Sequence, residues 1–296
     1  MKPAPNVPDL DVLERSVDEA LRRADVGALR VLGYGEISCV LAWRAGELDV
    51  ACKRLPPFAT EAQLARYRSA LDTYLARLAE RGIHVVPTTL QTVSRADGTL
   101  GVYCVQPTLP LGSLGPRYAA AASSEDALAL FTRIVERVVA CVDGKLGLDG
   151  QLSNWAWNDG ELGYLDVSTP MVRDAAGREL LDTDLFLASL PWALRGGVRR
   201  FLLGSILDKY YTRRGVLLDL LGNLHKEQLE RYVEPVLALV APHVDVPITT
   251  REIRAYYEED ARMWSFLQSL RRADRAWQRR VRRRVYPFLL PGRIER

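Results

Sequence analysis

The sequence has few of the side chains that bind soft metals or form covalent cross-links. Its four cysteines are scattered and show neither disulfide nor metal-ligand spacing, and its three histidines lie far apart along the chain. These side chains therefore indicate neither a zinc site nor a disulfide framework. We expect the cysteines to be buried apolar thiols in a reducing compartment, which makes the expected location cytoplasmic.

Long hydrophobic runs are also missing. No segment approaches the roughly 18 apolar residues that a membrane-spanning helix needs, so we expect no membrane span. The N-terminal segment MKPAPNVPDLDVLERS lacks the apolar core of a secretory signal. The chain of 296 residues is 48% hydrophobic and 26% charged, which is enough to bury a substantial core.

Charge is unevenly distributed. The net charge is +3, yet residues 271–296 contain ten arginines against Asp274 and Glu295, a local balance of +8. A solvated basic helix face is the default interpretation. The alternative is a platform for an anionic substrate, nucleic acid or acidic partner. The expected apolar face of this C-terminal helix consists of Trp264, Leu267, Leu270, Trp277 and Val281, and the expected basic face of Arg272, Arg275, Arg279 and Arg282.

The first 107 residues predict a mixture of helices and hairpins. Apolar spacing indicates a helix over residues 9–25, closed by Gly27, and a second helix over residues 59–81. Between them lie two β-rich runs, and two more strands follow the second helix. After Pro107 a segment rich in Pro and Gly indicates a linker, residues 125–142 predict a buried helix, and most of the chain beyond residue 182 is expected to be helical.

Three oxygen-bearing side chains form the most informative pattern. Asp149 and Asn154 lie five residues apart in GLDGQLSNWAW, and Asp166 follows twelve residues later in GYLDVS. Phosphoryl transfer needs positioning and charge neutralisation rather than covalent help from the protein. One carboxylate can take the proton of an acceptor hydroxyl, while an amide oxygen and a second carboxylate can hold Mg²⁺. The alternative is that all three are turn and capping residues.

A lysine that could hold phosphates lies upstream. Lys53 stands in the strand DVACKRL and shares a face with Ala51 and Leu55. Its ammonium group either grips phosphates or snorkels at the strand end. A phosphate-binding lysine would need a carboxylate partner on the following helix, for which Asp72 and Glu61 are the candidates.

A glycine-containing turn precedes this strand. LGYGEISCV places Gly33 and Gly35 between two strand segments, followed by Ser38. A turn without side chains lets backbone N–H groups approach phosphate oxygens, although such a turn is often only structural. It is not a dinucleotide-binding fingerprint, because it connects a strand to a strand rather than to a helix.

Together these motifs resemble the protein-kinase-like superfamily, and in particular its aminoglycoside- and choline-kinase-type small-molecule phosphotransferases. The matches are Gly33, Gly35, Ser38 and Val40 for the glycine-rich loop, Val50-Ala51-Cys52-Lys53 for V-A-I-K, Asp149 and Asn154 for the catalytic loop, and Asp166 for the metal-binding aspartate. The resemblance covers residues 29–170. It implies an α+β, two-lobed fold with an N-lobe over 1–107, a helical C-lobe over 108–296 and a cleft near Gln106.

The resemblance also implies a set of site residues and cofactors. Asp149 would be the catalytic base, and Asn154 and Asp166 would hold Mg²⁺. The implied binding residues for ATP or GTP are Gly33, Gly35, Ser38, Lys53, Asp72 and Gln106. The sequence thus predicts an ATP-dependent, Mg²⁺-dependent phosphotransferase acting on a hydroxyl of a small molecule.

Several positions depart from the pattern of the superfamily. Ser38 replaces the third glycine, Gly147 stands where a histidine is usual, and Val167-Ser168 follow Asp166 in place of Phe-Gly or Trp-Glu. No Ala-Pro-Glu segment follows, which argues against a protein kinase with a phosphorylated activation loop. Two alternatives to the enzyme stay open: a pseudokinase that acts as a nucleotide-binding or partner module, and a nucleic-acid-associated protein with a basic tail.

Overall fold

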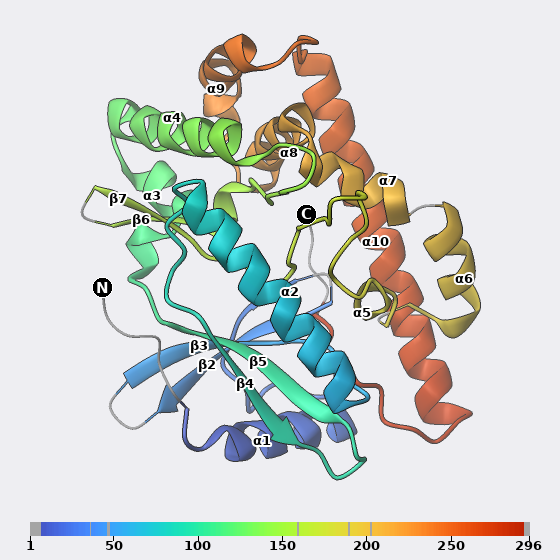
Figure 1. The fold of residues 1–296 in the computed structure, drawn as a ribbon. Coiled ribbons are helices and arrows are strands. Elements are labelled where there is room, and N and C mark those ends of the chain that lie inside the picture. Colours follow the sequence, from blue (N-terminus) through green and yellow to red (C-terminus); the bar gives the residue numbers. More distant parts are fainter. Residues whose placement is uncertain are drawn as a thin grey trace.

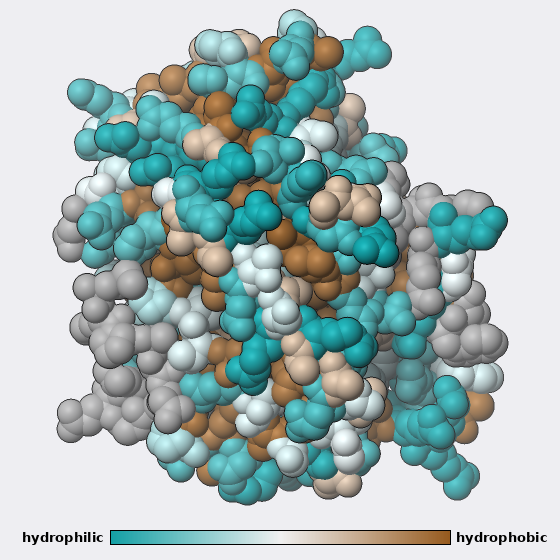
Figure 2. Space-filling model, in the orientation of Figure 1, coloured by the Kyte–Doolittle hydropathy of each residue, from teal (hydrophilic) through white to brown (hydrophobic). Residues whose placement is uncertain are grey.

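The chain combines a small antiparallel sheet with a helical C-terminal part (Figure 1). The structure is a computed structural model and describes residues 7–35, 37–45, 48–158, 160–188, 190–201 and 203–292. Within these ranges, no helix has both the length and the apolar character that crossing a bilayer requires. On the face seen in Figure 2, hydrophilic residues predominate, and hydrophobic ones form small patches between them.

The sheet has five antiparallel strands in the order β1-β2-β3-β5-β4. The two hairpins predicted from the sequence are both present, because β2 pairs with β3 and β4 with β5. Of the turn expected between β2 and β3, Gly46 lies outside the described residues. The strands are β1 (Val31–Tyr34), β2 (Cys39–Ala45), β3 (Leu48–Arg54), β4 (Thr89–Ser94) and β5 (Leu100–Pro107).

Two helices cover opposite faces of this sheet. Helix α1 (Leu10–Arg23) packs on the face that carries Cys52 and Tyr103, and α2 (Glu61–Glu80) packs on the face that carries Cys104 (Figure 1). Side chains alternate between the two faces along each strand. Lys53 therefore lies on the α2 face of β3 and Arg54 on the α1 face, and the predicted alternation of these two side chains is confirmed.

The end of α1 differs from its prediction. Ala24, in the left-handed conformation at φ 56°, ends this helix three residues before Gly27. Its backbone N–H donates to the carbonyl groups of Ala20 and Leu21, which satisfies the last turn without a glycine. The predicted end of α2 is confirmed, since Gly82 follows it at φ 71°.

The helical part begins after β5. A second, two-stranded sheet pairs β6 (Trp155–Asn158) with β7 (Glu161–Tyr164) and follows helix α4. The prediction that this helix is buried all round is wrong, because only one face packs into the core and the face with Arg133 and Glu136 is exposed. The helices are α3 (Gly115–Ala121), α4 (Ser124–Cys141), α5 (Asp184–Leu187), α6 (Trp192–Phe201), α7 (Leu203–Asp208), α8 (Arg213–Lys226), α9 (Val233–Val240) and α10 (Thr250–Arg280). Short 3₁₀ segments are η1 (Leu111–Ser113), η2 (Leu152–Asn154), η3 (Lys209–Tyr211), η4 (Glu230–Tyr232) and η5 (Ala241–His243).

Helix α10 links the helical part to the sheet. At 1.5 Å per residue its 31 residues span about 46 Å, and it runs along one side of the molecule (Figure 1). Near its end the Arg279 side chain donates to the carbonyl of Arg22 in α1. The expected apolar face is wrong in this half of the helix, because Trp277 is exposed while Gln268 and Arg271 are buried.

A buried ionic network fixes α1 to the sheet. Glu14 is only 3% exposed, and its carboxylate accepts hydrogen bonds from Arg54 Nε at 3.0 Å and Nη2 at 2.8 Å. Arg95 and the Tyr103 hydroxyl donate to the same carboxylate. Arg54 also donates to the carbonyl of Pro287, so the C-terminal segment joins this network. A buried charge stays stable only when it is paired in this way.

We predict that Glu14→Gln lowers the free energy of unfolding by about 3 kcal/mol, because it leaves the buried Arg54 guanidinium without a counter-charge, while Arg95 keeps Asp18 and Asp97. Urea denaturation measures the difference. Asp11→Asn is the matched control, since the Asp11–Arg15 pair on the same helix is exposed and should change stability by less than about 1 kcal/mol. Equal effects of the two substitutions would contradict the structural role of Glu14.

We also predict how the stability difference between the wild type and Glu14→Gln depends on pH. Burial alone raises the pKa of Glu14, but the hydrogen bond and charge of Arg54, with Tyr103 and Arg95, outweigh it and hold this pKa below its usual value. The stability that an ionised Glu14 contributes is therefore present above the pKa of the unfolded chain and is lost as the pH falls through the folded pKa. The stability difference between wild type and Glu14→Gln should stay constant above about pH 5 and shrink in more acidic buffers.

Candidate functional site

An ion pair joins the sheet to the loop that follows β7. The Lys53 Nζ atom lies 2.7 Å from Asp166 Oδ1, with the two side chains 19% and 24% exposed. Lys53 comes from β3, and Asp166 comes from a segment more than a hundred residues later. The fold therefore brings together two of the residues that the sequence pattern singled out.

The loop around Asp166 is held by hydrogen bonds on both sides. The Leu165 N–H donates to the carbonyl of Asn154 at 2.8 Å, and the Leu165 carbonyl accepts from Gln106 Nε2 at 2.8 Å. Ser168 then donates to Asp166 Oδ1 through both its backbone N–H at 3.2 Å and its hydroxyl at 2.8 Å. Gln106, expected to bind the nucleotide, thus uses its amide nitrogen to position this loop.

The departure at Val167-Ser168 has a structural explanation. Val167 is buried in the main hydrophobic core, and the Ser168 carbonyl accepts from the Tyr67 hydroxyl of α2 at 2.9 Å. Burial raises the pKa of Asp166, but the charge and hydrogen bond of Lys53, with the Ser168 donors, outweigh it and lower that pKa below its usual value. Asp166 is therefore ionised at neutral pH.

Asp149 and Asn154 lie in one loop between α4 and β6. The Asn154 Nδ2 group donates to the backbone carbonyl of Asp149 at 3.3 Å, and the Tyr164 hydroxyl donates to the same carbonyl at 3.3 Å. The Asp149 carboxylate accepts from the Gln151 N–H at 3.2 Å. These bonds fix the backbone of the loop, and Asp149 and Asp166 lie close enough for their charges to interact.

Gly147, which replaces the usual histidine, lies where no side chain fits. A Cβ atom there would meet the Tyr210 carbonyl oxygen at 2.9 Å and the Met171 Cβ at 3.0 Å. The Gly147 N–H donates to the Met171 carbonyl at 2.9 Å, and its own carbonyl accepts from the Tyr74 hydroxyl at 3.2 Å. Backbone contacts and a tyrosine therefore brace the loop in place of a histidine.

Three residues near Asp149 were not predicted from the sequence. Asp219 of α8 is buried, and its Oδ1 atom accepts from Lys209 Nζ at 3.4 Å and from the Tyr256 hydroxyl of α10. Lys209 Nζ also donates to the Tyr256 hydroxyl at 2.7 Å. The sequence did contain a sign of Asp219, because this acid interrupts the apolar run VLLDLLG, and an acid inside a buried helix needs a partner.

This cluster changes the protonation of Asp149. Burial, followed by the negative charges of Asp219 and Asp166, raises the pKa of Asp149 to about 7, against smaller opposing effects of the Gln151 N–H and the Lys209 charge. A carboxyl group with such a pKa can both hold and release a proton near neutral pH. Strongly perturbed acids of this kind are frequent at functional sites.

The glycine-containing turn has the predicted hairpin connection. Gly33 belongs to β1, and the Gly35 N–H donates to the Ser38 carbonyl at 3.0 Å. A Cβ atom on Gly35 would lie 2.6 Å from Ser38 Oγ, whereas one on Gly33 would meet nothing within 4 Å. A side chain at position 35 would therefore require Ser38 to move, whereas Gly33 borders open space. Glu36, at the tip, lies outside the described residues.

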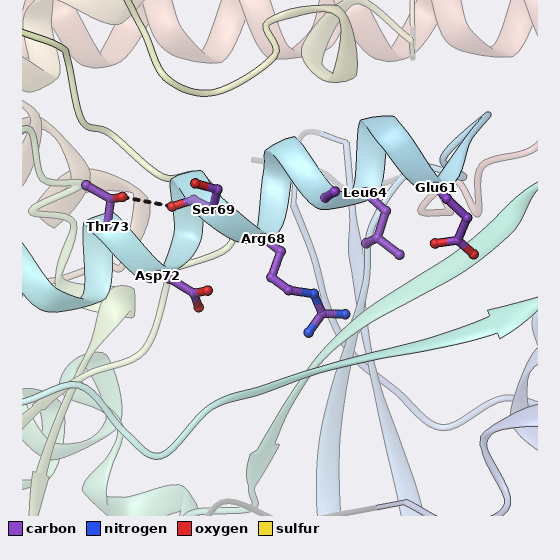
Figure 3. Close-up of a pocket in the computed structure, with 7 residues that line it drawn as sticks. Glu61, Leu64, Arg68, Ser69, Asp72 and Thr73 are labelled. Carbon is purple, nitrogen blue, oxygen red and sulfur yellow. Dashed lines mark hydrogen bonds between the residues drawn. The ribbon is translucent and has the colours of Figure 1, made fainter.

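The predicted carboxylate partner of Lys53 on α2 is not found. Asp72 and Glu61 are both exposed, and they line a surface hollow of about 410 Å³ along this helix (Figure 3). Among the described residues no ion pair joins Lys53 to either of them; its partner is Asp166. The expectation fails because both carboxylates lie on the solvent side of α2, while the opposite side of this helix packs against the core.

The donor set suits magnesium better than a soft metal. Within the described residues, no cluster of three or more His, Cys, Asp or Glu side chains could hold a metal ion. Mg²⁺ is commonly held by only one or two carboxylates, with waters and substrate phosphates completing its shell. The ionised Asp166 carboxylate fits this need, as does the Asn154 amide, which donates through Nδ2 and keeps Oδ1 as an acceptor.

A family model described as a family of unknown function (DUF6206) matches residues 12–275, so the chain belongs to that family. The sequence matches no curated protein. Among solved structures, a mutant kinase domain of PknI from Mycobacterium tuberculosis is similar at 16% identity, with a TM-score of 0.36. The similarity covers 78% of this chain and 94% of that domain. A likeness this distant does not establish a function.

We predict that Gly147→Ala destabilises the loop that carries Asp149. The added methyl group would overlap the Tyr210 carbonyl, and such overpacking typically lowers stability by about 1–3 kcal/mol. Gly112→Ala is the control, because a Cβ there would meet nothing within 4 Å. Thermal unfolding of the two variants measures the effect. Unchanged stability in Gly147→Ala would show that the loop and η3 are not packed as described.

Proposed function

We propose that this member of the DUF6206 family is an ATP-dependent, Mg²⁺-dependent phosphotransferase that acts on a hydroxyl group of a small molecule. The observation that carries the proposal is the Lys53–Asp166 ion pair of 2.7 Å, with the high-pKa acid Asp149 and the amide of Asn154 beside it. GTP is the alternative nucleotide. A cation, an ionised acid, an amide oxygen and a proton-accepting acid are the groups that phosphoryl transfer requires.

Each residue has a proposed role. Lys53 binds the phosphates of the nucleotide, and its ammonium group leaves Asp166 to do so. Asp166 and Asn154 hold Mg²⁺, which, when bound, neutralises the charge of the transferred phosphoryl group. Asp149 orients the acceptor hydroxyl and receives its proton. Gly33, Gly35 and Ser38 form the turn that would lie against the phosphates, with the Gly35 N–H engaged by the Ser38 carbonyl.

The proposal includes a division of the chain into two units. Residues 1–107, which contain the five-stranded sheet, would supply the phosphate-binding lysine and the glycine turn. Residues 108–296, which are mainly helical, would supply Asp149, Asn154 and Asp166. Gln106 lies at the boundary and donates a hydrogen bond to the Leu165 carbonyl. The connection between the two units would therefore also position the loop that carries Asp166. Asp72 lies outside this site.

We predict that ATP with Mg²⁺ raises the melting temperature of the wild type, because a ligand that binds only the folded state stabilises it. At a ligand concentration of 100 times Kd the stabilisation is about 2.7 kcal/mol. Asp166→Asn should remove most of the dependence on Mg²⁺, and Lys53→Met should weaken nucleotide binding with or without the metal. Differential scanning fluorimetry measures the melting temperatures of the wild type and the two variants with ATP, in the presence and absence of Mg²⁺.

The matched control for Asp166→Asn is Asp245→Asn, because Asp245 is exposed and lies in the loop before α10. This variant should keep the full shift with ATP and Mg²⁺. If the melting temperature of the wild type does not shift, or if that of Asp166→Asn shifts in a way that still depends on Mg²⁺, the proposed assignment of the nucleotide site is wrong.

Asp149→Asn separates the enzyme from a pseudokinase. We predict that this variant still binds ATP with Mg²⁺ but loses 10²–10⁴-fold in phosphate release or transfer, the usual contribution of a positioned base. The measurement is ³²P transfer from ATP to water and to a panel of polyols, amino alcohols and sugars. If the wild type binds the nucleotide but transfers phosphate no faster than Asp149→Asn to every acceptor, the protein is a nucleotide-binding module and not an enzyme.

A further inference from the structure

A groove runs between α10 and the C-terminal segment that follows it. It has a volume of about 300 Å³, which is at the lower end of the usual range for small-molecule sites. It is distinct from the site around Asp149, since none of its lining residues is among those assigned to phosphotransfer. Its lining includes Arg262, Trp264, Gln268 and Arg272 of α10, and Pro291 and Gly292 of the C-terminal segment.

Gln268 is the unusual residue of this groove. Its side chain is only 4% exposed, yet neither its amide nitrogen nor its amide oxygen has a hydrogen-bond partner. An unsatisfied buried polar group costs about 1–3 kcal/mol, so its presence in a folded protein calls for an explanation. The adjacent donor and acceptor of a glutamine amide can bind a matching pair on a ligand, as they do with the N6 and N7 atoms of adenine.

The other lining groups complement such a ligand. Arg262 and Arg272 bring positive charge, and no carboxylate lines the groove among the described residues. Arg262 donates through Nε to the Glu258 carbonyl, and Arg272 donates through Nη2 to the carbonyls of Pro291 and Gly292. A guanidinium group has five N–H donors, so these contacts leave capacity for an anion. Trp264 adds an aromatic surface against which a base can pack.

We propose that this groove binds a purine mononucleotide, with the base edge on the Gln268 amide and the phosphate on Arg262 and Arg272. Because both amide atoms are covered, the ligand reaches them when the Gln268 side chain turns toward the groove about its flexible torsions. The volume of about 300 Å³ suits a mononucleotide rather than a nucleic-acid strand. The site is independent of the proposed phosphotransfer site and does not depend on that proposal.

Calorimetric titration with adenosine 5′-monophosphate tests this assignment. We expect saturable binding to the wild type, weakened about tenfold or more by Gln268→Met, which removes the amide and keeps the length of the side chain. Gln268→Met should not lower the melting temperature, because it removes an unsatisfied polar group. Arg262→Gln should weaken binding of the monophosphate but leave binding of adenosine unchanged. Arg254→Gln, which removes an exposed arginine of α10 outside the groove, should bind like the wild type.

The two sites are distinguished by Lys53→Met. This variant should bind adenosine 5′-monophosphate in the groove like the wild type, whether or not the phosphotransfer site exists. The proposal is overturned if no saturable binding occurs, or if Gln268→Met binds with unchanged affinity. It is equally overturned if Lys53→Met abolishes binding, because the nucleotide would then occupy the other site.

Discussion

The ion pair between Lys53 and Asp166 is the constraint on which the arrangement of the site depends. It connects the central strand of the sheet to the loop after β7, and its short distance of 2.7 Å requires both segments to be held rigidly. The supports are visible on each side: Gln106 and Ser168 fix the loop, while β3 lies between β2 and β5 in the sheet. A nucleotide that binds Lys53 would therefore replace the contact between Lys53 and Asp166 with one between Lys53 and a phosphate, while the strand and the loop stay in position.

The electrostatic balance around Asp149 follows from which acids are paired. Asp166 has Lys53, and Asp219 has Lys209 and the hydroxyl of Tyr256. Asp149 makes no ion pair among the described residues, and burial and its two acidic neighbours outweigh the charge of Lys209 and raise its pKa. The same physical rule keeps one acid ionised for a metal and another able to accept a proton. The Glu14 network acts elsewhere and fixes α1 and the C-terminal segment to the sheet.

The sequence predicted what depends on periodicity and turn chemistry. Both hairpins, the face of Lys53 and the extents of α2 and α4 follow from local patterns. It could not predict contacts made across the fold: Asp72 has a suitable offset from Lys53, but both Asp72 and the other candidate, Glu61, lie on the solvent side of α2. The reason for Gly147 appeared only with the carbonyl of Tyr210, which is more than sixty residues away. Gln268 of α10 is buried, and the returning C-terminal segment lines the same groove; helical periodicity contains no information about that segment.

The central claim is that Lys53, Asp166, Asn154 and Asp149 form one nucleotide–magnesium site. A crystal structure with Mg²⁺ and a non-hydrolysable ATP analogue tests it most directly. We predict the metal between Asp166 and Asn154, Lys53 on the phosphates instead of on Asp166, and the γ-phosphoryl group facing Asp149. A nucleotide bound elsewhere, with the Lys53–Asp166 ion pair intact, would contradict it.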